Sequence, residues 1–330
     1  MMLNRAPSPS ADASVADGSI EMRLTAIVYG GEGTNLFEFR TLDGADVPPF
    51  TAGAHVDVNL PNGTIRQYSI ASSQTDCSRY LLGVKLEEKG RGGSRFLHEQ
   101  VRVGHVLKIG LPRNHFPLNE QAAMSVLIAG GIGVTPMLCM AERLRSLDRP
   151  FRLHYAVRTR GEALLAHIDE DDERIDLHID VEQDGRLLDI AAIVAAAPAD
   201  AELYCCGPAP MLDAFEQACA SRPPKHVHIE RFSAEGNVAA ADGSYTVELA
   251  KSKRTITVQA GQTLLQALQA AGLTVKISCE QGICGTCETR VLAGTPDHRD
   301  MILSDEEKAS NETMMVCCSG SLSPTLVLDL

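Results

Sequence analysis

The segment 279–287 reads Cys-Glu-Gln-Gly-Ile-Cys-Gly-Thr-Cys, and a fourth cysteine follows at Cys317. This spacing, C-x4-C-x2-C with a distant fourth cysteine, is typical of plant-type iron–sulfur proteins, in which four thiolates hold a 2Fe–2S cluster. The two glycines of the segment suit a loop that brings backbone amides close to sulfur, often at positive φ. The segment therefore predicts an electron carrier.

The same cysteines could instead belong to a disulfide pair or a zinc knuckle. Zinc ribbons usually show two separated C-x2-C pairs, whereas this sequence has one, preceded by a C-x4-C step. Cys318 is ambiguous, because neighbouring residues of an extended segment point in opposite directions and one of the pair at 317 and 318 would face the cluster. We expect buried, small apolar roles for four further cysteines. They are Cys77, Cys139, Cys205 and Cys219.

Composition indicates a globular chain of two or three domains, with 330 residues and 44% hydrophobic content. Ten cysteines and an N-terminal stretch without a hydrophobic core favour a reducing cytoplasm. The net charge of −13 argues against nucleic acid or an anionic membrane as a partner. The uncharged run 123–141 is nearly long enough to span a bilayer, but its glycines and Pro136 divide it into a strand, a turn and a helix start.

The pattern of strands and helices divides the chain into segments. Residues 1–19 are expected to be a disordered tail, and 20–118 show short strands broken by turns, which predicts an antiparallel β-barrel. In 119–232 strands alternate with helices, which predicts a parallel α/β nucleotide domain. Residues 233–243 form a small, polar linker. The final segment, 244–330, predicts an α+β ferredoxin domain of the β-grasp type.

A flavin site is predicted from two motifs in the barrel segment. Residues 66–70 read Arg-Gln-Tyr-Ser-Ile in a strand, and 90–94 read Gly-Arg-Gly-Gly-Ser before a helix. An arginine and an aromatic ring two positions apart share a strand face, so one can hold a phosphate while the other packs on a ring. The helix start offers amides and a hydroxyl to the same phosphate. The candidate cofactor-binding residues are Arg66, Tyr68, Ser69, Ile70, Arg91, Gly92, Gly93 and Ser94.

A nucleotide site is predicted at the carboxyl edge of the parallel sheet. The first turn, 130–136, reads Gly-Gly-Ile-Gly-Val-Thr-Pro between a strand and a helix, and the second, 206–208, reads Cys-Gly-Pro in the same setting. Taken alone, the first turn could be a close-packed connection without a ligand. Two such turns at one edge favour anion binding at helix starts. The candidate residues are Gly130, Gly131, Gly133, Thr135, Pro136, Cys206, Gly207 and Pro208.

The order of these motifs resembles the phthalate dioxygenase reductase family, which includes vanillate O-demethylase reductases, within the ferredoxin-NADP reductase superfamily. The resemblance covers about 20–330 and implies an FMN domain, an NADH domain and a plant-type ferredoxin, in that order. It implies a monomer that feeds electrons to a separate Rieske-type oxygenase acting on aromatic compounds. It also favours Cys317 over Cys318. The metal ligands implied are Cys279, Cys284, Cys287 and Cys317.

The same resemblance assigns roles to the flavin and nicotinamide residues. Arg66 and Ser94 would bind the FMN phosphate, and Tyr68 would lie on the isoalloxazine ring. Ser69 would hydrogen-bond near the reactive N5, and Cys206 would line the nicotinamide site, so these two are the candidate catalytic residues. The aromatic residue at 232, Phe232, matches a position near the flavin in relatives.

The mechanism predicted is a relay from NADH to flavin to iron. NADH gives two electrons as hydride and the cluster accepts one at a time, so a flavin between them is needed. The chain is not the oxygenase itself, because no cysteine is followed two places on by histidine, as a Rieske site requires. Alternative functions are reduction of a cytochrome or P450-type monooxygenase and a slow redox-responsive interaction protein. NADPH stays open, since Arg158 and Arg160 follow a strand where a 2′-phosphate could bind.

Overall fold

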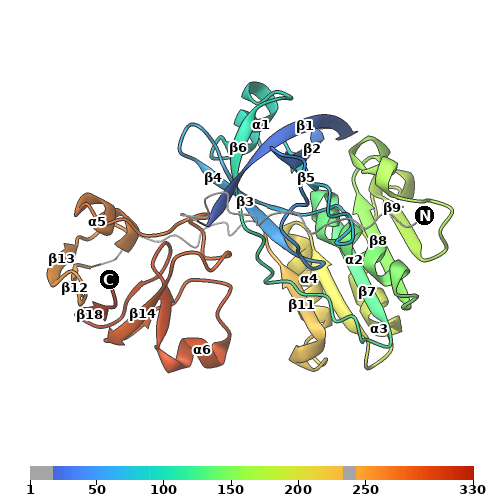
Figure 1. Ribbon diagram of the computed structural model, residues 1–330. Helices are drawn as coiled ribbons and strands as arrows, with labels where there is room; N and C mark the ends of the chain where they lie inside the picture. The colour runs from blue at the N-terminus through green and yellow to red at the C-terminus, as the bar shows by residue number, and fades with distance from the viewer. Residues whose placement is uncertain (1–17, 89, 233–242) are drawn as a thin grey trace, which may run out of the picture.

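The computed structural model describes residues 18–88, 90–232 and 243–330, and each predicted segment forms its own sheet (Figure 1). The first sheet has the strand order β4-β3-β6-β1-β2-β5, with antiparallel pairs throughout. A bridge between Ile70 and Leu82 joins its two edges, so the sheet closes into the predicted barrel. Strand β1 starts at Ser19, one residue inside the predicted tail. The elements are β1 (Ser19–Gly31), β2 (Thr34–Thr41), β3 (His55–Asn59), β4 (Ile65–Ser69), β5 (Tyr80–Lys85), α1 (Gly93–Gln100) and β6 (Val106–Gly110).

The second sheet is parallel throughout, in the order β11-β10-β7-β8-β9. All six residues of β7 and all five of β10 are buried, as expected for central strands covered on both faces. The strands are β7 (Ser125–Gly130), β8 (Phe151–Val157), β9 (Ile175–Ile179), β10 (Glu202–Cys206) and β11 (Val227–Glu230). The α-helices are α2 (Val134–Ser146), α3 (Ile190–Ala196) and α4 (Ala209–Ala218). The 3-10 helices are η1 (Gly131–Gly133), η2 (Arg160–Glu162), η3 (Leu165–His167), η4 (Asp180–Gln183) and η5 (Pro224–His226).

The third sheet is mixed and has the order β13-β12-β18-β14-β16. Strands β12 and β18 run parallel, and the other pairs are antiparallel. Helix α5 begins at a capping box in which Thr263 and Gln266 satisfy each other's backbone amides. The elements are β12 (Tyr245–Leu249), β13 (Arg254–Val258), α5 (Leu264–Ala270), β14 (Glu288–Ala293), β15 (Pro296–Asp297), α6 (Asp305–Ser310), β16 (Thr313–Met315), β17 (Gly320–Ser321) and β18 (Thr325–Leu328).

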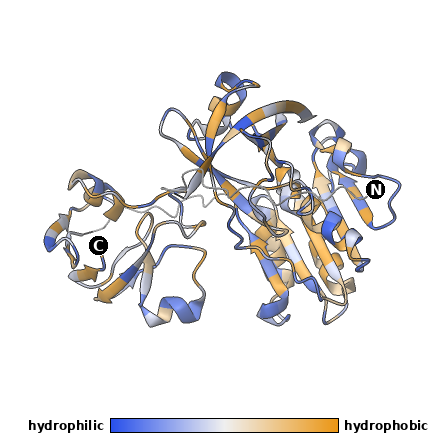
Figure 2. Cartoon of the chain, in the orientation of Figure 1, coloured by the Kyte–Doolittle hydropathy of each residue, from blue (hydrophilic) through white to orange (hydrophobic). Residues whose placement is uncertain are grey.

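The apolar residues collect into cores that couple two of the domains and leave the third separate (Figure 2). One core runs from the barrel into α2 and one face of the parallel sheet, so these two domains pack as a single body. The opposite face of that sheet packs on α3 and α4. The ferredoxin domain has a core of its own and stands to one side in Figure 1. Its position against the barrel must therefore depend on contacts other than a shared apolar core.

The predicted linker, 233–243, lies outside the described residues except for Gly243. The run 123–141, weighed as a membrane span, forms β7 and most of α2. Among the described residues, no helix combines the length and the apolar character that crossing a bilayer would need.

Candidate electron-transfer site

The two glycine turns of the nucleotide domain lie against each other. Strands β7 and β10 are neighbours, with Ala129 opposite Cys206, so the turns that follow them leave the same edge. A Cβ added to Gly133 would lie 2.6 Å from the carbonyl carbon of Cys206, and one added to Gly130 would lie 2.7 Å from the Cδ of Pro208. Glycine is required here by the close approach of two backbones. The arrangement places two helix starts side by side at the carboxyl edge, as the sequence predicted.

In the first turn, Gly131 has free space beside it, whereas Thr135 packs against its neighbours. Gly131 has a φ of +54°, and a Cβ there would meet nothing within 4 Å. The Thr135 hydroxyl donates a hydrogen bond to the Ile132 carbonyl at 3.0 Å, and its methyl group lies against Gly83 of β5. Thr135 therefore positions the turn against the barrel, and Gly131 leaves room beside it.

A serine, a glutamate and a cysteine from three strands meet where the barrel joins the nucleotide sheet. Ser69 ends β4, and its hydroxyl donates to Glu230 Oε2 at 3.3 Å. Glu230 ends β11 directly opposite Cys206 on β10. Enclosure of its carboxyl group raises the pKa of Glu230 to about 8, although the hydrogen bond from Ser69 opposes this rise. The carboxyl is therefore largely protonated at neutral pH and can donate a proton.

Glu230 touches Ser69 in space although the two residues are 161 positions apart in the chain. The sequence analysis did not identify Glu230 as a site residue. A glutamate at the end of a short strand carries no local signal of burial. Cys206 is completely buried, and burial raises the pKa of its thiol well above the usual value. Its contribution at neutral pH is therefore that of a compact neutral group.

The predicted flavin strand lies next to the predicted phosphate turn. The Arg66 guanidinium donates to the Arg91 carbonyl at 3.1 Å, and a Cβ on Gly93 would lie 2.5 Å from Arg66 Cγ. Tyr68 is partly buried against the barrel core, and that burial raises its pKa, so its phenol stays neutral. Ile70 is fully buried in the core and its amide donates to the Ala54 carbonyl at 2.9 Å, so its side chain does not reach the predicted flavin site.

Helix α1 begins in the conformation expected of an anion-binding turn. Gly92, at its N-cap, has a φ of +83°, where glycine is strongly favoured. The Ser94 hydroxyl accepts a hydrogen bond from the Glu87 amide at 3.0 Å, so its own proton can still be donated. Two arginines and a helix start match the charge of a phosphate, so the residues present fit a flavin nucleotide.

Five buried cysteine sulfurs gather at the cluster segment, those of the four predicted ligands and that of Cys318. The sulfur of Cys279 lies beside those of Cys284 and Cys317, and the Cys317 sulfur also contacts those of Cys287 and Cys318. These contacts lower the pKa of Cys279 and raise those of Cys284 and Cys317. No three His, Cys, Asp or Glu side chains in the described part of the chain surround a single point. A 2Fe–2S cluster does not require this, because each iron takes two cysteine sulfurs.

Cys318 packs against Gly282 of the cluster segment. A Cβ on Gly282, whose φ is +73°, would lie 2.5 Å from Cys318 Sγ, so glycine is needed for this approach. The Cys318 thiol hydrogen-bonds to the Met315 carbonyl at 3.7 Å. The Cys318 sulfur therefore lies beside that of Cys317 and close to Gly282 of the cluster segment.

Phe232, which the resemblance places near the flavin, lies two residues after Glu230 and is 41% exposed.

Comparisons with known proteins agree with this geometry. Residues 21–117 match the model of the oxidoreductase FAD-binding domain, and 247–320 match that of the 2Fe–2S iron–sulfur cluster binding domain. The chain is 49% identical to the phenoxybenzoate dioxygenase subunit beta of Ectopseudomonas oleovorans, over 97% of this chain and 100% of that protein.

Two solved structures resemble the whole chain. Phthalate dioxygenase reductase, described as a modular structure for electron transfer from pyridine nucleotides to 2Fe–2S, superimposes with a TM-score of 0.73 at 34% identity, covering 96% of this chain and 99% of that one. An intact type IV self-sufficient cytochrome P450 monooxygenase gives a TM-score of 0.85 at 34% identity, covering 99% of this chain and 43% of that one. Agreement in motif order, in all three sheets and over full length identifies the family. The chain belongs to the phthalate dioxygenase reductase family of flavin and 2Fe–2S oxidoreductases.

Proposed function

We propose that this chain is the NADH-dependent, FMN-containing reductase component of a Rieske-type oxygenase or demethylase that acts on an aromatic compound. One observation carries the proposal: the predicted flavin residues touch both other domains. Ser69 reaches Glu230 of the nucleotide sheet, and Arg91 donates to the carbonyl of Cys279 at 2.6 Å. The barrel therefore lies between the predicted hydride donor and the predicted one-electron acceptor.

On the nucleotide side, the proposed binding residues are the two packed turns. The starts of the helices after Gly133 and Pro208 carry partial positive charge that favours a pyrophosphate, and the open space at Gly131 admits the chain of the dinucleotide. When bound, the nicotinamide supplies a hydride. Glu230 holds a proton at its carboxyl group beside Ser69, and the neutral Cys206 thiol fills the space behind them.

On the flavin side, FMN is proposed because the charges match a terminal phosphate. A terminal phosphate carries about two negative charges near neutral pH, and Arg66, Arg91 and the start of α1 supply compensating positive charge. Tyr68 provides the apolar face on which a flavin ring packs. Extraction of the bound flavin and mass measurement would distinguish FMN from FAD.

At the cluster, the proposed ligands are the four cysteines that the C-x4-C-x2-C spacing and the family resemblance indicate, and the close approach of their sulfurs supports this choice. When bound, a 2Fe–2S cluster accepts one electron at a time. The protein's own contribution is to keep these thiols buried and to hold their segment against the barrel. The ligands are Cys279, Cys284, Cys287 and Cys317.

NADH is proposed over NADPH because Arg160, one of the two arginines predicted to reach a 2′-phosphate, is already engaged in ion pairs. Arg160 follows β8 and forms ion pairs with Glu170 at 2.7 Å and Glu182 at 3.0 Å. These two carboxylates would repel a phosphate dianion at the same place. Discrimination between NADH and NADPH would then come from repulsion of the 2′-phosphate by these carboxylates as much as from attraction of NADH.

The proposed partner is a separate oxygenase, with a cytochrome P450 as the second candidate. The relative named as a dioxygenase subunit matches 97% of this chain and supports the first. The likeness to 43% of the chain of a self-sufficient cytochrome P450 monooxygenase supports the second. Both functions need the same electron relay, so only the identity of the partner protein distinguishes one from the other.

The test is an anaerobic titration of the purified holoprotein with NADH, followed by absorbance and EPR. Bleaching of a flavin band together with a rhombic signal from a reduced 2Fe–2S cluster is expected. A reduced flavin without cluster signal, in protein shown to contain iron, would overturn the proposed relay. Turnover with a Rieske oxygenase and with a P450 as alternative acceptors then identifies the partner class.

A further inference from the structure

The ferredoxin domain has its own core, so its contacts with the barrel decide where the cluster lies relative to the flavin site. Two side-chain contacts join the cluster segment to the barrel at consecutive residues. Ser278 donates to Asp57 Oδ1 at 2.7 Å, and the Cys279 carbonyl accepts from Arg91 at 2.6 Å. These contacts hold the residue just before the first predicted ligand and that ligand's own backbone.

Asp57 is built into the barrel wall next to the predicted flavin strand. It lies on β3, and its partner across the ladder is Gln67, which stands between Arg66 and Tyr68 on β4. Asp57 is 8% exposed, and Ser278 is 2% exposed. Because both side chains are almost completely removed from water, their hydrogen bond has little competition from solvent. A change at this contact is therefore transmitted directly between the two domains.

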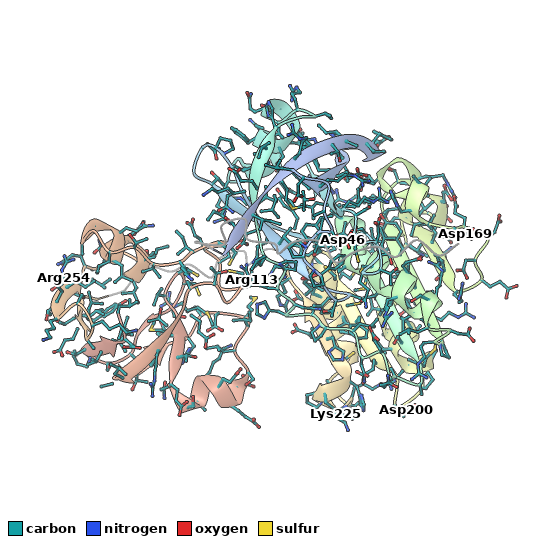
Figure 3. All side chains as sticks on the ribbon, in the orientation of Figure 1. Asp46, Arg113, Asp169, Asp200, Lys225 and Arg254 are labelled. Carbon is teal, nitrogen blue, oxygen red and sulfur yellow. The ribbon has the colours of Figure 1, made fainter. Side chains whose placement is uncertain are left out.

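The Asp57 carboxylate is itself oriented by an arginine of the barrel. Its Oδ2 pairs with Arg113 Nη1 at 2.9 Å, while Oδ1 receives the bond from Ser278. Arg113 lies at the junction of the barrel and the ferredoxin domain (Figure 3). Two further nitrogens of Arg113, Nε and Nη2, are buried without a hydrogen-bond partner in the described part of the structure. The Arg113 side chain is 33% exposed and that of Asp57 is 11% exposed, so the ion pair is partly shielded from water.

A second pair of residues extends the same contact region. The backbones of His55 and Arg113 exchange two hydrogen bonds, of 2.9 and 3.0 Å, so Arg113 is fixed to the start of β3. The His55 ring stacks on His115, with centroids 5.5 Å apart. A Cβ on Gly285 of the cluster segment would lie 3.7 Å from His115 Nε2. Both halves of the cluster segment therefore face the barrel.

We propose that Asp57 is a positioning residue for electron transfer from flavin to cluster: held by Arg113, its carboxylate anchors Ser278 and so fixes the first cluster ligand against the flavin barrel. The inference rests on the proposed function. The step moves one electron from reduced flavin to oxidised cluster, so the flavin is oxidised by one electron, the cluster is reduced by one, and no bond is made or broken. Asp57 touches neither cofactor and acts through Ser278.

Ser278→Ala is the cleanest test, because it removes the bond between the domains and leaves the ion pair of Asp57 and Arg113 intact. Ser278→Thr restores the hydroxyl, and Ser252→Ala, at an exposed serine of the same domain, is the matched control. The holoproteins are compared by stopped-flow reduction with NADH, by iron and flavin content, and by hydrogen exchange of amides in 276–287. Hydrogen exchange reports the position of the segment without relying on turnover.

With Ser278→Ala, we expect these amides to exchange about tenfold faster, since a hydrogen bond to a charged acceptor contributes at least that factor to an equilibrium. The flavin-to-cluster phase should slow by up to about tenfold, while the NADH-to-flavin phase and the iron content keep wild-type values. Threonine should restore both properties, and the control should change neither.

Wild-type exchange and a wild-type flavin-to-cluster phase in Ser278→Ala would overturn this inference and leave the proposed function intact. Slow electron transfer that threonine fails to restore would also overturn it, since the hydroxyl would then not be the cause. Failure of the wild-type protein to reduce its cluster with NADH would instead refute the proposed function. The two failures are therefore distinguishable in one set of measurements.

Discussion

Replacement of Gly133 by alanine should separate the two turns of the nucleotide domain. Gly133 has an ordinary helical φ of −61°, so alanine brings no backbone strain there. Its Cβ would lie 2.6 Å from the carbonyl carbon of Cys206 and 2.9 Å from the Gly207 nitrogen, whereas real Cβ atoms keep at least 3.0 Å from such neighbours. Both neighbours are backbone atoms and cannot rotate away. The turns must therefore move apart by roughly 0.5–1 Å, as overpacked sites do.

Such overpacking costs about 1–3 kcal/mol of unfolding free energy. The barrel and nucleotide domains share a core, so this corresponds to a fall in Tm of roughly 3–10 °C for a body of that size. Displacement of a binding turn by this amount should also slow hydride transfer from NADH by about 10- to 100-fold. The assays are a thermal scan and stopped-flow flavin reduction at saturating NADH.

Gly185→Ala is the matched control, because Gly185 lies outside the site. Its φ is +76° and a Cβ there would meet nothing within 4 Å, so the substitution adds backbone strain without a clash. It should lower the Tm slightly and leave flavin reduction unchanged. If Gly133→Ala reduced its flavin at the wild-type rate with a Tm near the wild-type value, the close packing of the two turns would be refuted as a requirement for NADH binding.

Three further predictions concern the proton, the ligands and the dinucleotide. Burial raises the pKa of Glu230 from 4.5 to about 8, so the folded protein keeps a proton that the unfolded chain releases. The stabilising effect of this proton should be complete below pH 4.5 and be lost as the pH rises through 8. Glu230→Gln should remove this part of the dependence of Tm on pH, and parallel curves for the variant and the wild type would contradict the assignment. Cys317→Ser should abolish the visible absorbance and iron content of the cluster while Cys318→Ser retains both, and the reverse result would make Cys318 the ligand. The double variant Glu170→Gln, Glu182→Gln removes the two carboxylates that pair with Arg160. It should lower the ratio of kcat/KM for NADH to kcat/KM for NADPH by about tenfold. An unchanged ratio would show that the 2′-phosphate of NADPH binds elsewhere.

Sequence patterns predicted those elements whose local signal agrees with their environment. Strand β8 and helix α3 are each an apolar run of the right period between clear turn residues, so the alternation of strands and helices in 119–232 could be recognised from them. Strand β9 gives a weaker signal, since Ile175–Ile179 is a half-buried edge strand that follows an acidic stretch. The motifs for flavin, nucleotide and cluster could be recognised for the same reason: each is a short local pattern with its own chemistry.

Contacts between those motifs could not be predicted in this way. Glu230 meets Ser69 across 161 residues, and Ser278 meets Asp57 across 221. A lone aspartate in a strand and a lone serine before a cysteine have no periodicity or spacing that ties one to the other. Their pairing follows from how whole domains pack, which a single sequence does not encode in any short window.

The position of β18 has a consequence for the order in which the chain matures. This strand lies in the middle of the ferredoxin sheet, paired with β12 on one side and β14 on the other. During synthesis, which runs from the N-terminus, the barrel and nucleotide domains can complete their shared core while this central strand is still missing. The sheet that supports the cysteines closes after residue 328 has emerged from the ribosome. The ferredoxin sheet can therefore be completed only after the other two domains have been synthesised, and a chain terminated before β18 would lack the central strand of the sheet that supports the cysteines.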